Sequence, residues 1–159
     1  MAGLGGASVL GAGHSIESQA RQGAVVAYKG EYPEVPVARS RNLEKHTAVT
    51  FYYPDKASPC LLIRSGKPLP DGVGPDSDIV AFSAMCTHMG CTVFYDQDSE
   101  TMKCPCHFSV FDPEKAGQMV CGHATADLPR ILLKEDTRTG QIVATGVSGL
   151  LYGRVANLL

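Results

Sequence analysis

Two short segments decide the fold of this chain: C-T-H-M-G-C from Cys86 to Cys91, and C-P-C-H-F-S from Cys104 to Ser109. Each segment offers a cysteine and a histidine close together, and one further cysteine. Thiolates and imidazoles suit zinc or iron–sulfur chemistry, so a set of two cysteines and two histidines admits either metal. The spacing of the residues therefore has to decide between them.

The spacing favours iron over zinc. A zinc finger usually places C-x2–4-C before H-x3–5-H, so that each arm is all cysteine or all histidine. Here each arm is mixed, with C-x-H in the first segment and C-x2-H in the second. A Rieske centre needs this ligand set, because two histidines replace two cysteines on one of its two irons. The full pattern C-T-H-x-G-C followed by C-P-C-H-x-S closely resembles the Rieske family.

The resemblance implies one Rieske [2Fe–2S] cluster with four protein ligands. By position in the motif, Cys86 and Cys104 hold the inner iron, and His88 and His107 hold the outer iron. Neutral imidazoles in place of two thiolates make the cluster less negative, so it accepts an electron more easily. Rieske centres accordingly lie at about −150 to +300 mV, well above about −400 mV for plant-type ferredoxins.

The chain has six cysteines, of which two are assigned to iron. In the disulfide-bearing branch of the Rieske family the extra cysteines of the two loops, here Cys91 and Cys106, bond to each other and tie the loops over the cluster. Closing such a loop is worth on the order of 3 kcal/mol in the chain-entropy model. A persistent disulfide also favours an oxidising compartment such as the periplasm. We expect the remaining two, Cys60 and Cys121, to pack as small buried hydrophobes.

Four neighbouring residues are expected to tune the cluster or to bind a partner. Ser109 matches the serine that in the family donates to a bridging sulfide. Phe111 stands where high-potential relatives carry a tyrosine that donates to a ligand sulfur; it has no donor, so we expect a potential below the top of the Rieske range. Met89 and Phe108 lie beside the ligand histidines and form the candidate docking surface, although a patch that merely shields the cluster is the alternative. Phe108 replaces a glycine common in the high-potential branch.

The composition fits one globular domain. The chain has 159 residues, of which 44% are hydrophobic and 19% charged, and this length suffices to bury a core. Its net charge of −2 gives no basic footprint, so no nucleic-acid partner is expected. No uninterrupted span of about 20 apolar residues is present, so this chain is not expected to cross a membrane.

We interpret residues 1–23 as a signal-peptide remnant or a flexible N-terminal segment. The first thirteen residues are largely apolar and contain no Lys or Arg, which favours the remnant of a signal's apolar region. We expect the protein to be exported to the periplasm in its folded state. This expectation implies a signal of the twin-arginine type, whose arginines are not in this chain.

β-Strand signals dominate the rest of the chain. Strands are expected at 24–27, 48–53, 60–64, 79–83, 92–95, 101–103, 131–134, 141–145 and 150–155, and short helices at 15–21 and 38–45. Residues 65–75 are dense in Gly and Pro and predict a loop. The pattern predicts an all-β fold. The Rieske resemblance implies antiparallel sheets that form a base within residues 24–159, with an inserted cluster-binding subdomain at about 84–128.

Several further passages are similar to the small (Rieske) subunit of arsenite oxidase. They include E-K-A-G-Q-M from Glu114 to Met119, A-T-A-D-L-P-R from Ala124 to Arg130, and L-Y-G-R from Leu151 to Arg154. With the first cluster segment, Pro59-Cys60 and residues 72–75, the similarity covers most of residues 45–159.

The subfamily resemblance implies a role in electron transfer rather than in substrate chemistry. In that family a large molybdopterin-containing subunit oxidises arsenite to arsenate. The Rieske cluster then passes electrons to a cytochrome c or a small copper protein. This chain has no second cysteine set for another cluster, so we expect it to be the non-catalytic subunit and catalysis to lie in the partner.

Three alternatives remain open at this point. The Rieske subunit of a cytochrome bc-type quinol oxidase normally carries a membrane helix and the sulfur-bonding tyrosine. A Rieske ferredoxin or oxygenase domain generally lacks the extra cysteine pair, and an oxygenase needs a separate iron site of two histidines and a carboxylate, for which His14, His46 and His123 are the remaining histidines. A zinc module without redox activity is the third.

Overall fold

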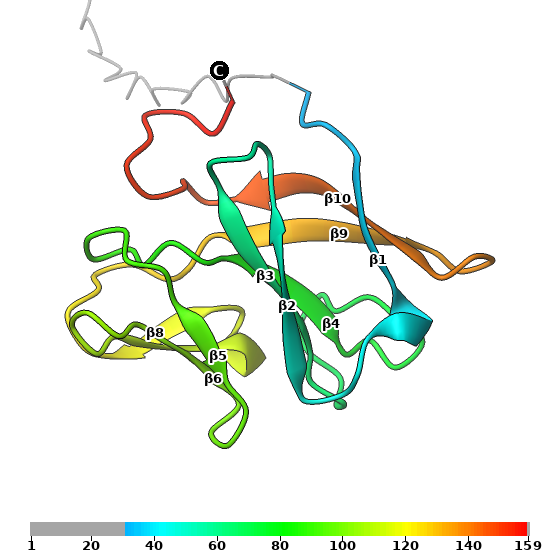
Figure 1. The fold of residues 1–159 in the computed structure, drawn as a ribbon, viewed down its shortest axis with the longest axis horizontal. Coiled ribbons are helices and arrows are strands. Elements are labelled where there is room, and N and C mark those ends of the chain that lie inside the picture. Colours follow the sequence, from blue (N-terminus) through cyan, green and yellow to red (C-terminus); the bar gives the residue numbers. More distant parts are fainter. Residues whose placement is uncertain (1–30, 159) are drawn as a thin grey trace, which may run out of the picture.

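The computed structural model describes residues 31–158, which form two antiparallel sheets (Figure 1). The larger sheet has six strands in the order β1-β10-β9-β4-β3-β2, and the smaller has four in the order β5-β6-β7-β8. Apart from two short 3-10 turns, the ordered elements in this range are strands, so the all-β prediction is confirmed. None of the helical turns in residues 31–158 is long and apolar enough to span a bilayer.

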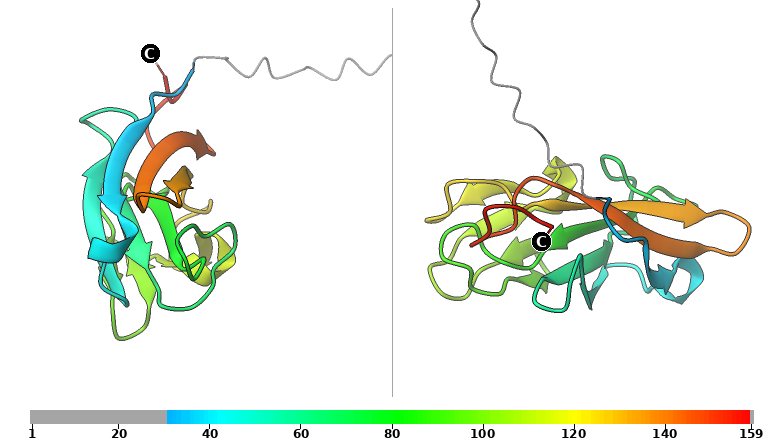
Figure 2. Two further views of the ribbon diagram at one scale, coloured as in Figure 1. Left: turned by 90° about the vertical axis from the view of Figure 1, so that its right-hand side faces the viewer. Right: turned by 90° about the horizontal axis from the view of Figure 1, so that it is seen from above.

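The strands of the smaller sheet are inserted in the sequence between two strands of the larger sheet. The larger sheet consists of β1 (Val35–Arg39), β2 (Thr47–Tyr52), β3 (Pro59–Arg64), β4 (Ile79–Ser83), β9 (Arg130–Asp136) and β10 (Gln141–Ser148). The smaller consists of β5 (Phe94–Asp96), β6 (Thr101–Lys103), β7 (Val110–Asp112) and β8 (Gln118–Cys121), and the 3-10 turns are η1 (Ser40–Asn42) and η2 (Pro113–Lys115). The smaller sheet therefore lies between β4 and β9 in the chain, at one end of the molecule (Figure 2).

Strands β3 and β4 are buried on both faces and connect two hydrophobic cores. Side chains of successive strand residues point to opposite faces. Leu61 and Ile63 of β3 accordingly join one core, whereas Cys60 and Leu62 join the other. Residues on β4 alternate in the same way. The continuous apolar sequence of both strands follows from this double burial.

The first of these cores extends from the larger sheet to the metal loops. Beside the residues of β3 and β4 it contains Met102 and Phe111 of the smaller sheet, and the predicted ligands Cys86 and Cys104. The close fit is evident at Gly117, where an added Cβ would lie 2.8 Å from two ring carbons of Phe82. The two sheets are therefore packed directly on each other.

Most of the predicted strands are present, with bounds that differ by up to three residues. Strands predicted at 48–53, 60–64, 79–83, 92–95, 101–103, 131–134 and 141–145 correspond to β2 to β6, β9 and β10. Strands β7 and β8 were not predicted from the sequence. The strand expected at 24–27, the helix expected at 15–21 and the N-terminal segment 1–23 lie outside the described residues.

Two element predictions are wrong. The helix expected at 38–45 is instead the end of β1, where Ala38 and Arg39 pair with β10, followed by the three-residue turn η1. The strand expected at 150–155 is an irregular segment. It is bounded and interrupted by Gly149 and Gly153, whose φ angles of +97° and +75° are not those of a strand.

The two cysteines outside the motif differ. Cys60 is fully buried, which confirms its prediction as a core residue. Cys121 is exposed, so the core prediction is wrong for it. It ends β8, an edge strand of the smaller sheet, just past a register shift against β7. The neighbouring Val120 is exposed as well, so this end of β8 lies outside the core.

Candidate metal centre

The two cysteine–histidine segments form loops of the same backbone design. In the first, which connects β4 to β5, Cys86 N–H donates to Cys91 O and Gly90 N–H donates to Cys86 O, at 2.9 and 2.8 Å. In the second, between β6 and β7, Cys104 N–H donates to Ser109 O and Phe108 N–H donates to Cys104 O, at 2.8 and 3.1 Å. Each loop is thus closed by the same pair of bonds counted from its first cysteine.

This design requires a left-handed residue at the fifth position of each loop. Gly90 occupies that position in the first loop with φ +76°, and Phe108 occupies it in the second with φ +58°. Glycine adopts such an angle without steric penalty, whereas a bulky side chain is an outlier there. The strain is therefore confined to one loop, at Phe108.

The structure brings the four sequence-predicted ligands together. Cys86 and Cys104 are buried free thiols that belong to the same hydrophobic core. The rings of His88 and His107 lie at the same end, with centroids 4.6 Å apart and planes nearly perpendicular. His88 Nδ1 is buried with no hydrogen-bond partner. Two buried thiols and an unpartnered imidazole nitrogen fit the donor set that a [2Fe–2S] cluster of the mixed type requires.

Two polar groups oppose the effect of burial at Cys86. Burial raises the pKa of the Cys86 thiol, and the backbone N–H of His88 and the hydroxyl of Ser109 each act to lower it. Ser109 is fully buried, and its Oγ accepts from the N–H groups of His123 and Ala124 at 3.1 and 2.9 Å. With both of these donors in place, the hydroxyl hydrogen is left free to point at sulfur.

Phe111, the other predicted tuning residue, is fully buried on β7. It packs in the same core as Cys86 and Cys104 and carries no group that could donate to either sulfur. The tuning role of Phe111 stays a prediction.

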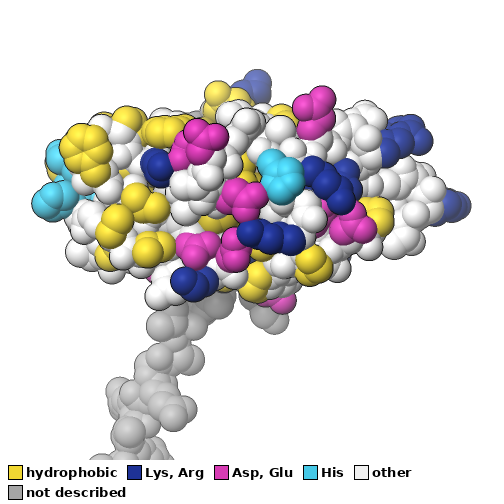
Figure 3. All heavy atoms as spheres, turned by 90° about the horizontal axis from the view of Figure 1, so that it is seen from below, with side chains coloured by type: hydrophobic (Ala, Val, Ile, Leu, Met, Phe, Trp, Pro, Cys, Tyr) yellow, Lys and Arg dark blue, Asp and Glu magenta, His cyan; other side chains and the backbone are white. Residues whose placement is uncertain are grey.

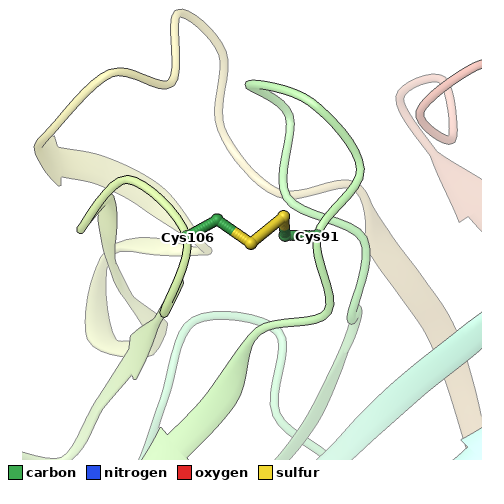
Figure 4. The surroundings of a disulfide bond; sticks show 2 residues. All are labelled: Cys91 and Cys106. Carbon is green, nitrogen blue, oxygen red and sulfur yellow. A yellow bond between two sulfur atoms is a disulfide. The ribbon is translucent and has the colours of Figure 1, made fainter.

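A disulfide joins the two loops, between Cys91 and Cys106, as the family resemblance implied (Figure 4). Cys104 Sγ lies within 4.8 Å of both sulfurs of this bond. Three cysteine sulfurs are therefore grouped, but the two in the disulfide are not available as thiolates. The group is therefore not a further metal site: it shows that the disulfide lies close to Cys104 in the second ligand loop.

The sequence interpretation missed a third imidazole beside the predicted ligands. The His123 ring lies 5.6 Å from that of His88 and 6.2 Å from that of His107. It is placed there by a third loop whose Gly122 packs directly on Ser109, since an added Cβ would lie 2.3 Å from Ser109 Cα. The Gly-His pair after Cys121 was visible in the sequence, but only the packing of the third loop brings this histidine to the rim.

The rim carries exposed apolar side chains. Phe108 is 77% exposed and Met89 is 61% exposed. A shallow cavity of about 330 Å³ lies beside Phe108, and Phe94, Pro105 and Val110 contribute to its lining. Figure 3 shows hydrophobic side chains next to histidine at this end of the molecule, whereas charged side chains gather over the middle of the same face.

The fold and this centre define an all-β iron–sulfur protein with mixed cysteine and histidine ligation. A family model for the Rieske [2Fe-2S] domain matches residues 33–143. The chain belongs to the Rieske family and therefore binds a [2Fe–2S] cluster.

Known relatives agree with this assignment. The chain is 36% identical to the iodate reductase subunit IdrB of Denitromonas iodatirespirans over 137 residues, which cover 84% of this chain and 73% of that protein. It is 35% identical to the IdrB of Pseudomonas sp. strain SCT, over 80% of this chain and 67% of that one. Among solved structures, the soluble domain of Rieske protein II (soxF) from Sulfolobus acidocaldarius aligns with a TM-score of 0.69 at 25% identity, over 79% of this chain and 83% of that chain.

Proposed function

We propose that this chain is the electron-transfer subunit of an oxidoreductase, with Cys86, His88, Cys104 and His107 as the ligands of its cluster. The convergence of two buried thiols and two imidazoles from a matched pair of loops carries the proposal. When bound, the cluster supplies one-electron redox chemistry. The chain's own residues bury the two cysteines, place the Ser109 hydroxyl beside them and leave the histidine rim at the surface.

The ligand assignment is tested by comparing the three histidines of the rim. His88→Ala and His107→Ala should each abolish the Rieske EPR signal, because each removes one of four ligands. His123→Ala should keep the signal, since His123 stands beside the ligands without belonging to the motif. A normal spectrum in either ligand variant would reject the assignment.

We further propose that the partner is a large molybdopterin-containing subunit and that the substrate couple is arsenite and arsenate. The passages from Glu114 to Met119, Ala124 to Arg130 and Leu151 to Arg154 support this proposal. Electrons then run from the large subunit through this chain to a cytochrome c or a small copper protein. The disulfide supports a periplasmic location.

Iodate reductase is the second candidate, favoured by the 36% and 35% identities to two iodate reductase subunits. The two candidates differ in the direction of electron flow. In the complex purified with its catalytic subunit, arsenite should reduce the oxidised cluster, so that the Rieske EPR signal of the reduced state appears. If instead iodate erases the signal of the reduced complex and arsenite has no effect, the iodate assignment replaces ours.

We also propose residues 84–128 as the cluster-binding subdomain and the rim as its docking surface. The left-handed strain at Phe108 supports docking over shielding. In the matched loop the same position is glycine, and a phenylalanine that is 77% exposed recovers little burial energy for its strained backbone. Strain of this kind persists where the side chain serves function, and here it presents an aromatic ring beside His107 to a partner.

A further inference from the structure

Residues 149–157, close to the end of the described range, run from the end of β10 toward the first ligand loop (Figures 1 and 2). We call it the C-terminal strap. Asn157 fixes its shape: the side-chain amide donates to Gly149 O at 2.7 Å and to Tyr32 Oη at 3.0 Å, and its oxygen accepts from Leu151 N–H at 2.9 Å. Leu151 is fully buried. The irregular backbone of the strap thus has defined partners.

An ion pair fastens the strap to the turn between β2 and β3. Arg154 Nη1 donates to Asp55 Oδ2 at 2.6 Å and Nη2 to Asp55 Oδ1 at 3.0 Å, which is the bidentate geometry that makes such pairs strong. Arg154 Nη2 also donates to Ser58 Oγ at 2.7 Å. The Arg154 guanidinium holds the pKa of Asp55 below its usual range. The pair is therefore charged at neutral pH.

The fastened strap places one aromatic ring on the first ligand loop. A Cβ built on Gly90 would lie 2.6 and 2.7 Å from Cδ1 and Cε1 of Tyr152. The ring therefore lies against the bare α-carbon of the residue whose N–H closes the loop onto Cys86 O. Gly90 has two reasons to lack a side chain: its left-handed φ and the space that Tyr152 fills.

We propose that Tyr152 is a positioning residue that holds the first ligand loop, and with it Cys86 and His88, in the closed geometry. The inference rests on the proposed ligand assignment for its effect on the cluster, but not for its effect on the loop. The disulfide ties the loop to its partner on one side, at Cys91. Tyr152 supports the loop from outside the subdomain, through the contact with Gly90.

Three strap variants test the proposal. Tyr152→Ala should accelerate amide hydrogen exchange at Gly90 and Cys86 several-fold, broaden the EPR lines of the cluster and shift its midpoint potential. Tyr152→Phe should restore all three, because the contacting atoms are ring carbons. Val155→Ala is the matched control: Val155 lies on the same strap and is fully exposed, so its loss should change nothing.

A second set of variants changes the other side of the contact, at Gly90, and the ion pair that fastens the strap, at Arg154. Gly90→Ala should drive the ring away and reproduce the spectral change, and in the double variant with Tyr152→Ala the two effects should be less than additive because the residues touch. Arg154→Gln should give the same changes in weaker form. The proposal is wrong if amide hydrogen exchange at Gly90 and Cys86 in Tyr152→Ala is as slow as in wild type. It is also wrong if the spectral changes of Gly90→Ala and Tyr152→Ala simply add in the double variant. Faster exchange with an unchanged EPR spectrum would leave the loop support standing and overturn the link to the ligands.

Discussion

At the scale of single residues, Phe108 pairs an unfavourable backbone angle with an exposed ring. We predict that Phe108→Gly stabilises the fold by up to about 1 kcal/mol, because relief of left-handed strain in a bulky residue exceeds the entropy that glycine adds to the unfolded chain. The same change should slow electron transfer to the acceptor and leave the potential unchanged. Thermal unfolding, voltammetry and stopped-flow kinetics measure the three quantities.

The control for this prediction is Val49→Ala, which trims a similarly exposed apolar side chain on edge strand β2 of the larger sheet. It should leave electron transfer at the wild-type rate. If Phe108→Gly transfers electrons to each tested acceptor as fast as wild type, the ring only shields the cluster.

Two buried residues next to the thiols give a prediction about potential. Ser109→Ala should lower the midpoint potential, because it removes a buried hydroxyl donor beside the thiols that favours the more negative, reduced cluster. It also strands the His123 and Ala124 N–H groups, a loss of about 1–3 kcal/mol each if they stay buried and unpaired. Phe111→Tyr should raise the potential by adding a hydroxyl beside the sulfurs. Film voltammetry that finds both variants at the wild-type value would contradict this account of tuning.

At the scale of elements, the first ligand loop connects the two sheets, the second connects β6 to β7 within the smaller sheet, and one disulfide joins the two loops. We predict that Cys91→Ser with Cys106→Ser lowers stability by about 3 kcal/mol, the value expected for closing a loop of this length, across a sequence separation of 15. Thermal unfolding checks it. Cys121→Ser, which alters an exposed free thiol, should have no such effect. Equal unfolding temperatures for the double variant and wild type would mean that the disulfide braces nothing.

Element prediction succeeded where local chemistry was sufficient. The strands β3 and β4 are continuous apolar runs, and the cysteine–histidine spacing is readable without a structure. It failed where a distant partner decides the outcome. Residues 150–155 have a strand-like composition, but Asn157 and Asp55 hold them as an irregular strap. Residues 38–45 begin with a strand because β10 offers an edge to Ala38 and Arg39.

The candidate site divides in the same way. The four proposed ligands, the disulfide pair and the proposed tuning residues Ser109 and Phe111 follow from the motif and its resemblance. His123 and Tyr152 do not, because they reach the ligand loops from segments that follow in the chain and carry no metal-binding pattern. Only the folded structure brings a third loop and a C-terminal segment to the same end.

At the scale of the whole molecule, a charged cluster joins the two sheets. Lys67, from the loop between β3 and β4, contacts Glu100 and Glu114 of the inserted region at 2.7 and 2.6 Å. His46, before β2, contacts Glu100 at 2.6 Å. Figure 3 shows charged side chains of both signs and a histidine on this face. The pairs are partly exposed, so each adds little to stability, although together they span the junction.

These ion pairs between the two sheets predict that the protein loses stability in acid. Lys67 first and then His46 hold the pKa of Glu100 below its usual range. A depressed pKa in the folded state contributes stability above the unfolded pKa, and this contribution is lost as the pH falls through the folded value. Glu100→Gln should therefore lower the unfolding temperature by about 1–3 °C at pH 7 and flatten its decline below about pH 4.5. A variant that declines as steeply as wild type would exclude Glu100 as a contributor.

The double burial of β3 and β4 has a mechanical consequence. A core that passes without interruption from the larger sheet to the thiol loops leaves no hinge between them in residues 31–158. We therefore expect the end that carries the cluster to move together with its base, and not to turn separately from one partner to another. If the electron donor and the electron acceptor use the same rim, the whole body must turn or the partners must take turns. Donor and acceptor would then compete for the same surface, and only one of them could be bound at a time.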